Sequence, residues 1–156
     1  MKKFWYNAVS EFCNFSEFRS QLENEPSVVK FIKKAIYEAD LNYADQLIFG
    51  VRVLCQSKPL LENLIDDLTV PVLFDLYRDY LRFASKDVVI YMLQTTNLLC
   101  QSPHSRINVL RNQTIVDILM LCLQKEDVDI ANEAARVLVN LLEYIPSNFK
   151  LSVLSG

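Results

Sequence analysis

The sequence feature that most constrains the fold is a pattern that returns every 42 to 45 residues. The tetrapeptide Leu-Cys-Gln-Ser occurs at residues 54–57 and again at residues 99–102, 45 positions later. A shift of 42 places Phe74-Asp75-Leu76 on Val116-Asp117-Ile118. In chains with such a period, one unit cannot bury its apolar face alone, so neighbouring units stack into a continuous core. The period therefore predicts a stack of similar units.

The apolar residues within each unit follow helical spacing. The clearest copy is residues 126–156, which reads as a long amphipathic helix, a break at Pro146 and a short helix. The chain has only two glycines in 156 residues, which leaves few positions for the tight turns of β-hairpins. No alternation of strands and helices with glycine-rich turns occurs in the sequence either. We therefore expect an all-α fold.

Capping residues and prolines mark the expected helix ends. Ser27 is expected to cap a helix that runs to Ala39, and Asp40 or Asn42 to open a helix that runs to about Gln56. Prolines at the end of each unit are expected to lie in breaks between helices. A short helix is expected after Ser16, with a break at residues 23–26. The remaining helices are expected at about residues 2–14, 60–68, 72–84, 88–101, 104–111 and 114–124, and from 126 onwards, with Pro59 and Pro103 in breaks and Pro71 close to a helix start.

A short, a longer and a longest helix alternate along the chain, so each unit is expected to contain three helices. We expect one domain with complete units at 16–57, 58–102 and 103–146 and partial units at 1–15 and 147–156. Stacked-repeat proteins normally carry polar caps at both ends. The first helix instead carries Phe4 and Trp5, so we expect either a piece of a longer stack or ends that a partner covers.

The third helix of the last complete unit resembles a known family. Ile130, Ala134, Leu138, Asn140 and Leu141 are similar to the armadillo pattern V-x-x-x-A-x-x-x-L-x-N-L. The resemblance is good over residues 103–156 and implies an armadillo-like superhelix of about three three-helix repeats with flanking partial repeats.

The resemblance is weaker in the N-terminal half. Thr96 stands where Leu138 does, and the asparagine position is Leu98 or, with a slip of one residue, Asn97. Gly50 falls inside an expected helix, at a cost of about 1 kcal/mol relative to Ala. A HEAT-like repeat is therefore an alternative for this half.

The resemblance also implies a binding surface. In armadillo proteins the third helices line a concave groove, where a ladder of asparagines binds the backbone of an extended peptide. Asn140 is the clear ladder position here; the alternative is that it only bonds the backbone of the neighbouring repeat. The expected groove residues are Asn140, Arg136 and Asn132 in the last complete unit, Asn97 and Gln94 in the preceding one, and Arg52, which aligns with Asn97.

These features favour a non-enzymatic protein–protein interaction module, a scaffold or adaptor that binds a protein or peptide segment in the groove. The alternative is a regulatory subunit, for example a small-GTPase regulator or a component of a heteromeric complex. It would bind, or self-associate, through its apolar terminal helices, with Phe4 and Trp5 in the interface. An enzyme or a nucleic-acid binder on the same scaffold is a third class.

Charge and targeting signals limit the expected partners and the expected location in the cell. The net charge of -3 and the pI near 5.2 provide no general attraction to nucleic acid or anionic lipid, so neither is an expected partner. Residues 4–12 lack the apolar run of a signal peptide, and the apolar stretches are too short to span a bilayer. We expect an intracellular protein, cytoplasmic or nuclear or both, without membrane insertion.

No cofactor or metal is expected. There is one histidine, His104, for which a break or first helical turn is expected, and the four cysteines form no C-x-x-C pair. Cys13, Cys55 and Cys100 fall at equivalent positions whose fourth member is Leu142, which predicts packing slots and, with Cys122, buried free thiols. The acidic pairs Asp66-Asp67 and Glu126-Asp127 are expected to cap helices.

Overall fold

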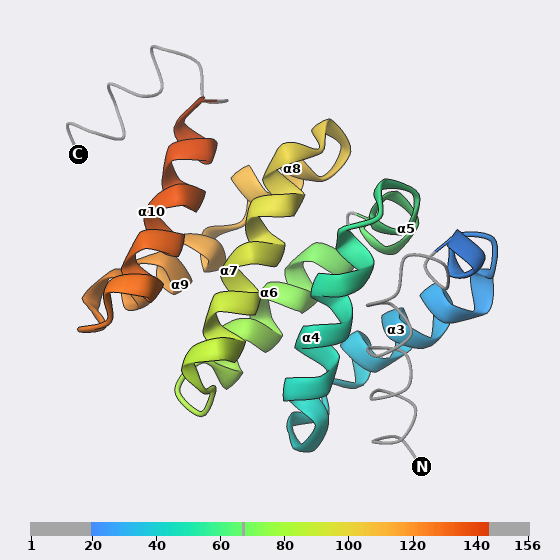
Figure 1. Ribbon diagram of the computed structural model, residues 1–156, viewed down its shortest axis with the longest axis horizontal. Helices are drawn as coiled ribbons and strands as arrows, with labels where there is room; N and C mark the ends of the chain where they lie inside the picture. Colours follow the sequence, from blue (N-terminus) through green and yellow to red (C-terminus); the bar gives the residue numbers. More distant parts are fainter. Residues whose placement is uncertain (1–19, 67, 144–156) are drawn as a thin grey trace.

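The described part of the chain is built from helices. The computed structural model describes residues 20–66 and 68–143, and within these ranges there are helices and no strands (Figure 1). The all-α expectation is confirmed for this part. The expectations for Phe4, Trp5, Cys13 and the partial units 1–15 and 147–156 lie outside the described residues.

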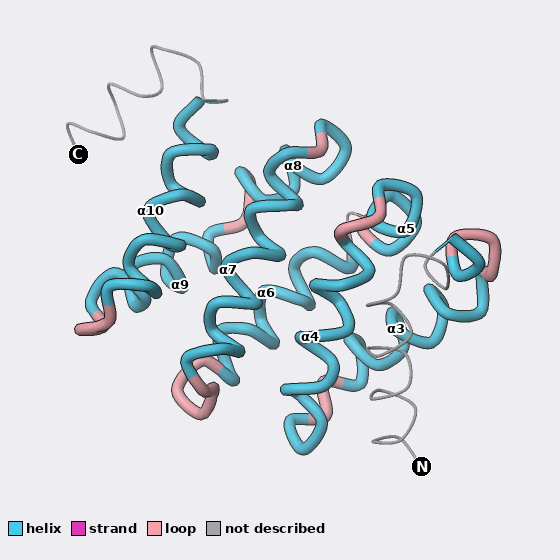
Figure 2. Tube along the Cα trace, viewed as in Figure 1, coloured by secondary structure: helices cyan, strands magenta, loops and turns pink. Residues whose placement is uncertain are grey.

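The elements follow one another with short connections, as Figure 2 shows. They are α3 (Pro26–Glu38), the 3-10 turn η1 (Leu41–Tyr43), α4 (Ala44–Cys55), α5 (Lys58–Leu64), α6 (Thr69–Tyr80), α7 (Lys86–Gln101), α8 (Pro103–Leu110), α9 (Gln113–Gln124) and α10 (Val128–Glu143).

Two rows of helices pack against each other. The long helices α4, α7 and α10 form one row, in which α7 contacts both neighbours (Figure 1). Helices α3, α6 and α9 form the second row, in which α6 contacts both neighbours. The short helix α5 packs against α3 and α4, and α8 against α6 and α7. Helices about one period apart in sequence are therefore neighbours in space.

Most helices start earlier than expected, since α3, α5, α6, α7, α8 and α9 each begin one to three residues before the expected position. The prediction that Ser27 caps α3 is wrong, because the residue before this helix is Glu25. Oε1 of Glu25 accepts hydrogen bonds from the backbone N–H of Ser27 at 3.4 Å and from the Ser27 hydroxyl at 2.7 Å. Helices α5 and α8 include Pro59 and Pro103, which were expected in breaks. A proline costs no hydrogen bond in the first turn, where the N–H has no helical partner.

Carboxylates set the start of two further helices. Oδ1 of Asp66 accepts hydrogen bonds from the backbone N–H groups of Leu68 at 3.0 Å and Thr69 at 2.7 Å, so α6 begins at Thr69 rather than at 72. At the start of α10, Oδ1 of Asp127 accepts hydrogen bonds from the backbone N–H groups of Asp129 at 2.9 Å and Ile130 at 3.1 Å. The capping role expected for these two acids is confirmed.

The buried residues repeat with the spacing seen in the sequence. Each long helix turns the same face to the core. Equivalent buried positions lie 45 residues apart in sequence between α4 and α7, and 42 residues apart between α7 and α10. Buried pairs at these shifts are Ala44 and Val89, Leu47 and Met92, Ile48 and Leu93, Gly50 and Thr95, Val51 and Thr96, Leu54 and Leu99, and Cys55 and Cys100, then Val88 and Ile130, Met92 and Ala134, Thr95 and Val137, and Leu99 and Leu141.

The cysteines of the described region lie in this core. Cys55, Cys100 and Cys122 are free and buried, as expected. Burial raises the pKa of the Cys55 and Cys100 thiols to about 12 and that of Cys122 to about 11. These three residues therefore act as small apolar side chains and not as nucleophiles.

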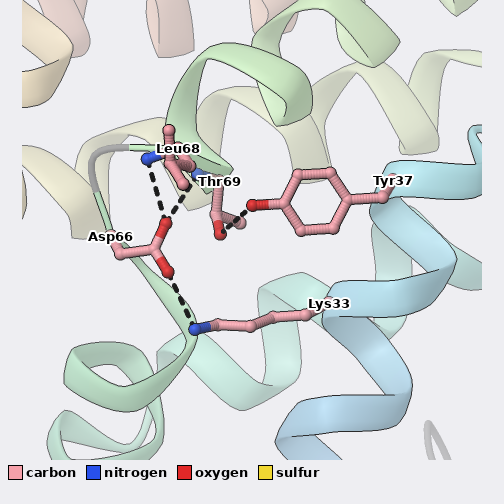
Figure 3. Close-up of polar contacts among 5 residues, drawn as sticks. All are labelled: Lys33, Tyr37, Asp66, Leu68 and Thr69. Carbon is pink, nitrogen blue, oxygen red and sulfur yellow. Dashed lines mark hydrogen bonds and ion pairs between the residues drawn. The ribbon is translucent and has the colours of Figure 1, made fainter.

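Polar contacts join neighbouring units through the capping acids. Nζ of Lys33 on α3 lies 2.9 Å from Oδ2 of Asp66, and the Tyr37 hydroxyl lies 3.3 Å from Oγ1 of Thr69 (Figure 3). Partial burial raises the pKa of Asp66, but the hydrogen bonds from Lys33 and Thr69 outweigh it and hold that pKa at about 2. Asp66 thus serves as a cap and as a link between units.

Candidate functional site

The candidate site is the face of the α4–α7–α10 row that carries polar side chains. The six expected groove residues all come from this row, and the structure gathers them into two clusters. The first cluster joins α7 to α10 and contains Asn97, Asn132, Arg136 and Asn140, and the second joins α4 to α7 and contains Arg52 and Gln94.

In the first cluster, the side chains of Asn140 and Asn97 are joined. Nδ2 of Asn140 donates a hydrogen bond to Oδ1 of Asn97, and both residues are half-buried. The burial pattern pairs α7 with α10 at a shift of 42, so Leu98 is the position equivalent to Asn140. The bond to Asn97 therefore runs diagonally between the helices. Asn140 bonds a side chain of its neighbour rather than the backbone that was considered as the alternative.

This pair lies at the edge of a hollow of about 460 Å³. Its lining residues are Asn97, Asn132, Ala135, Arg136, Val139 and Asn140. Val139 is exposed and provides an apolar contact. After their mutual bond, Asn140 retains its amide oxygen and Asn97 its amide N–H groups, an acceptor and a donor of the kind that a peptide backbone needs. The hollow thus offers complementary polar groups next to an apolar one.

Arg136 is exposed beside the hollow. Its guanidinium Nη1 lies 3.2 Å from Oε1 of Glu133 on the same helix. The Arg136 side chain is 69% exposed, whereas that of Glu133 is 16% exposed. A guanidinium has five N–H donors, so Arg136 can offer donors to a ligand while it remains paired with Glu133.

In the second cluster, Arg52 is held on two sides. Its Nε donates a hydrogen bond to Oε1 of Gln94 at 2.6 Å, and its guanidinium carbon lies 4.9 Å from the centre of the Tyr91 ring. The Tyr91 and Phe49 rings lie 5.3 Å apart at 57°. All four residues are half-buried. Cation–π and ring contacts of this type fix the plane of the guanidinium.

The sequence reading did not select Phe49 and Tyr91. They are 42 residues apart, and they stand three residues before Arg52 and Gln94, respectively. One helical turn separates each aromatic residue from the polar residue that follows it, so they share a helix face. That repeated spacing is the signal from which this cluster could have been expected.

The described residues hold no group of three His, Cys, Asp or Glu side chains that could bind a metal ion. His104 lies in the first turn of α8, one of the two positions expected for it. No helix in the described ranges has the length and apolar character needed to cross a membrane.

Comparison with known families gave no matching family model, and no curated protein matched the sequence.

Proposed function

We propose that the chain is an armadillo-like repeat protein that acts as a non-enzymatic scaffold or adaptor. It would bind an extended segment of a partner protein along the face of α4, α7 and α10. The observation that carries this proposal is the joined pair Asn97 and Asn140 beside the hollow that Arg136 and Val139 line.

The physical argument starts from what an extended peptide presents. Its backbone has one N–H and one C=O per residue, and both must keep hydrogen-bond partners when water leaves. The free oxygen of Asn140 and the free N–H groups of Asn97 supply such partners, and Val139 offers an apolar contact. The polar groups lie on rigid helices rather than loops, which lowers the ordering cost of binding.

The proposal is tested by quantitative affinity capture followed by mass spectrometry. The groove variant combines Arg136→Glu with Val139→Ser, two exposed positions whose substitution should leave the fold intact. The matched control combines Ile107→Ser on α8 with Arg111→Glu at the residue that follows α8, a comparable pair of changes at exposed positions.

We expect the groove variant to lose partners that the wild type and the control retain, with an unchanged melting temperature. Equal capture by both variants would exclude this face as the interface. Variant pairs at Arg52 and Gln94 then show whether the second cluster belongs to the same surface.

A second candidate is a regulatory subunit that binds through an end of the stack. Its support is the face of α9, which matches the face of α6 at a shift of 42. Phe74 on α6 is 0% exposed, whereas the equivalent Val116 on α9 is 47% exposed. The same contrast holds at the next pair of equivalent positions, where Leu81 is buried and Leu123 is exposed. The apolar side chains of this face are thus buried in the α6 unit, whereas their equivalents in the α9 unit are exposed.

Measurement of molar mass by light scattering tests this second candidate. Association through α9 should appear as a concentration-dependent rise in mass, and Val116→Ser with Leu123→Ser should abolish it. A mass that stays monomeric at all concentrations would argue against self-association through this face. The groove proposal does not depend on that result.

A further inference from the structure

A second surface lies along the edge of the stack formed by the connections between the two helix rows. These connections follow α3, α6 and α9, and Figure 2 shows them as loops along one side of the molecule. Leu41, Phe83 and Lys125 occupy them at successive spacings of 42 residues. Between them is an open hollow of about 810 Å³, lined also by Leu81, Arg82 and Leu121.

The surface is apolar at its centre. Phe83 is 60% exposed and Leu121 is 45% exposed, and Leu41 is exposed as well. Leu81 is buried beneath them. Three large apolar side chains, Leu41 of η1, Phe83 of the α6–α7 connection and Leu121 of α9, thus face solvent around one hollow. Such a cluster is more than the isolated apolar residue that is common on protein surfaces.

The rim of the hollow is basic. Arg78, Arg82 and Lys125 line it together with one acid, Asp79, although the whole chain has 16 basic and 19 acidic residues. Arg78 pairs with Asp79 at 3.3 Å. Arg82 lies 4.7 Å from the centre of the Phe83 ring, and neither it nor Lys125 forms an ion pair within the described ranges. Two cations therefore remain available beside the apolar centre.

We propose that this edge is a docking surface for an acidic protein segment that carries large apolar side chains. The apolar side chains would cover Phe83, Leu121 and Leu41, and the carboxylates would pair with Arg82 and Lys125. Burial of exposed apolar area provides the affinity, and the charges favour acidic over basic partners. A polyanion such as nucleic acid needs a longer run of cations than this hollow presents. The surface is separate from the groove of α4, α7 and α10.

A synthetic peptide tests this surface directly. The probe is a fluorescein-labelled peptide that alternates aspartate with leucine and phenylalanine, and binding is measured by fluorescence anisotropy. The edge variant combines Arg82→Glu with Phe83→Ser. The matched control combines Arg111→Glu with Ile107→Ser, a charge reversal and an apolar-to-serine change at exposed positions that belong to neither surface.

We expect saturable binding to the wild type and to the control variant, and binding weaker by about tenfold or more to the edge variant. Amide chemical shifts of Phe83, Leu121 and Lys125 should move during the titration. No saturable binding, or equal binding to the edge variant, would overturn the proposal.

Two further probes separate the edge from other anionic surfaces. A peptide with lysine in place of aspartate should bind more weakly, and equal binding would refute the role of charge. Vesicles that contain phosphatidylserine should not bind. If the wild type bound these vesicles and the edge variant did not, the partner of this surface would be a membrane and the proposal of a protein segment would be wrong.

Discussion

The side-chain amide of Asn140 on α10 donates a hydrogen bond to the side-chain oxygen of Asn97 on α7, 43 residues earlier. The proposed groove is therefore also a joint between two helices of the stack. A substitution at either asparagine changes the packing of the units as well as the groups offered to a partner. Arg136→Glu with Val139→Ser separates the two effects, because neither side chain takes part in the bond between the asparagines.

The joint itself can be measured by a double-mutant cycle. Asn97→Ala and Asn140→Ala should each lower the free energy of unfolding by about 0.5–1.5 kcal/mol, because each leaves a half-buried amide without its partner. The double variant should lose less than the sum of the two, by about 0.5 kcal/mol or more. Urea denaturation provides these values. Strict additivity would show that the two amides do not interact in solution.

Acid should weaken the link between α3 and α6 before it unfolds the whole chain. Asp66 has a pKa of about 2 in the fold, below its ordinary value of 3.8. The stability it contributes is present above about pH 4 and is lost as the pH falls towards 2. Because nearly half of this side chain is exposed, the effect should be about 1 kcal/mol or less.

Asp66→Asn tests this dependence, since asparagine can still cap α6 but carries no charge for Lys33. The variant should be less stable than the wild type at neutral pH, and the two should converge near pH 2. Thermal unfolding at a series of pH values records the difference. Asp117→Asn, at an exposed position of α9, is the control. A constant difference between wild type and Asp66→Asn down to pH 2 would contradict the assignment.

The core thiols should be inert in the folded protein. Burial raises the pKa of Cys55, Cys100 and Cys122 to about 12, 12 and 11, so little thiolate exists at pH 8. In a Cys13→Ser background, Ellman's reagent should label none of the three until urea unfolds the chain. Three equivalents of thiol should then appear together. Rapid labelling without denaturant would place them outside a stable core.

The hydroxyl of Tyr77 should contribute no stability. This side chain is fully buried on α6, with its ring 6.1 Å from that of Phe74. Its hydroxyl has no partner at hydrogen-bonding geometry among the described residues, and the Thr95 hydroxyl donates to the Tyr91 carbonyl at 2.8 Å. Tyr77→Phe should therefore be neutral or stabilising by up to about 1 kcal/mol.

Tyr77→Ala is the comparison for this prediction, because it removes the ring as well and should cost about 3–5 kcal/mol. Urea denaturation of both variants distinguishes the two contributions. A loss of more than 1 kcal/mol in Tyr77→Phe would mean that the hydroxyl has a partner, such as a buried water molecule.

Helix ends were harder to predict than helix positions. The apolar spacing located each described helix, because burial of one face imposes it along the whole element. The ends depend on single hydrogen bonds, and several residues near each break could supply them. Glu25 rather than Ser27 precedes α3, and Pro59 and Pro103 lie inside helices rather than between them.

The sequence by itself determined the all-α class of the described region and the residues that its long helices bury. The shifts of 45 and 42 found by self-alignment recur in the buried positions of α4, α7 and α10. Only the tertiary structure decided which polar side chains meet. Asn140 reaches Asn97 and not the equivalent position Leu98, and Arg52 reaches Gln94 while it stacks on Tyr91. Periodicity specifies the buried face of a helix, whereas contacts between helices depend on their relative offset and rotation, which are set when the units pack together.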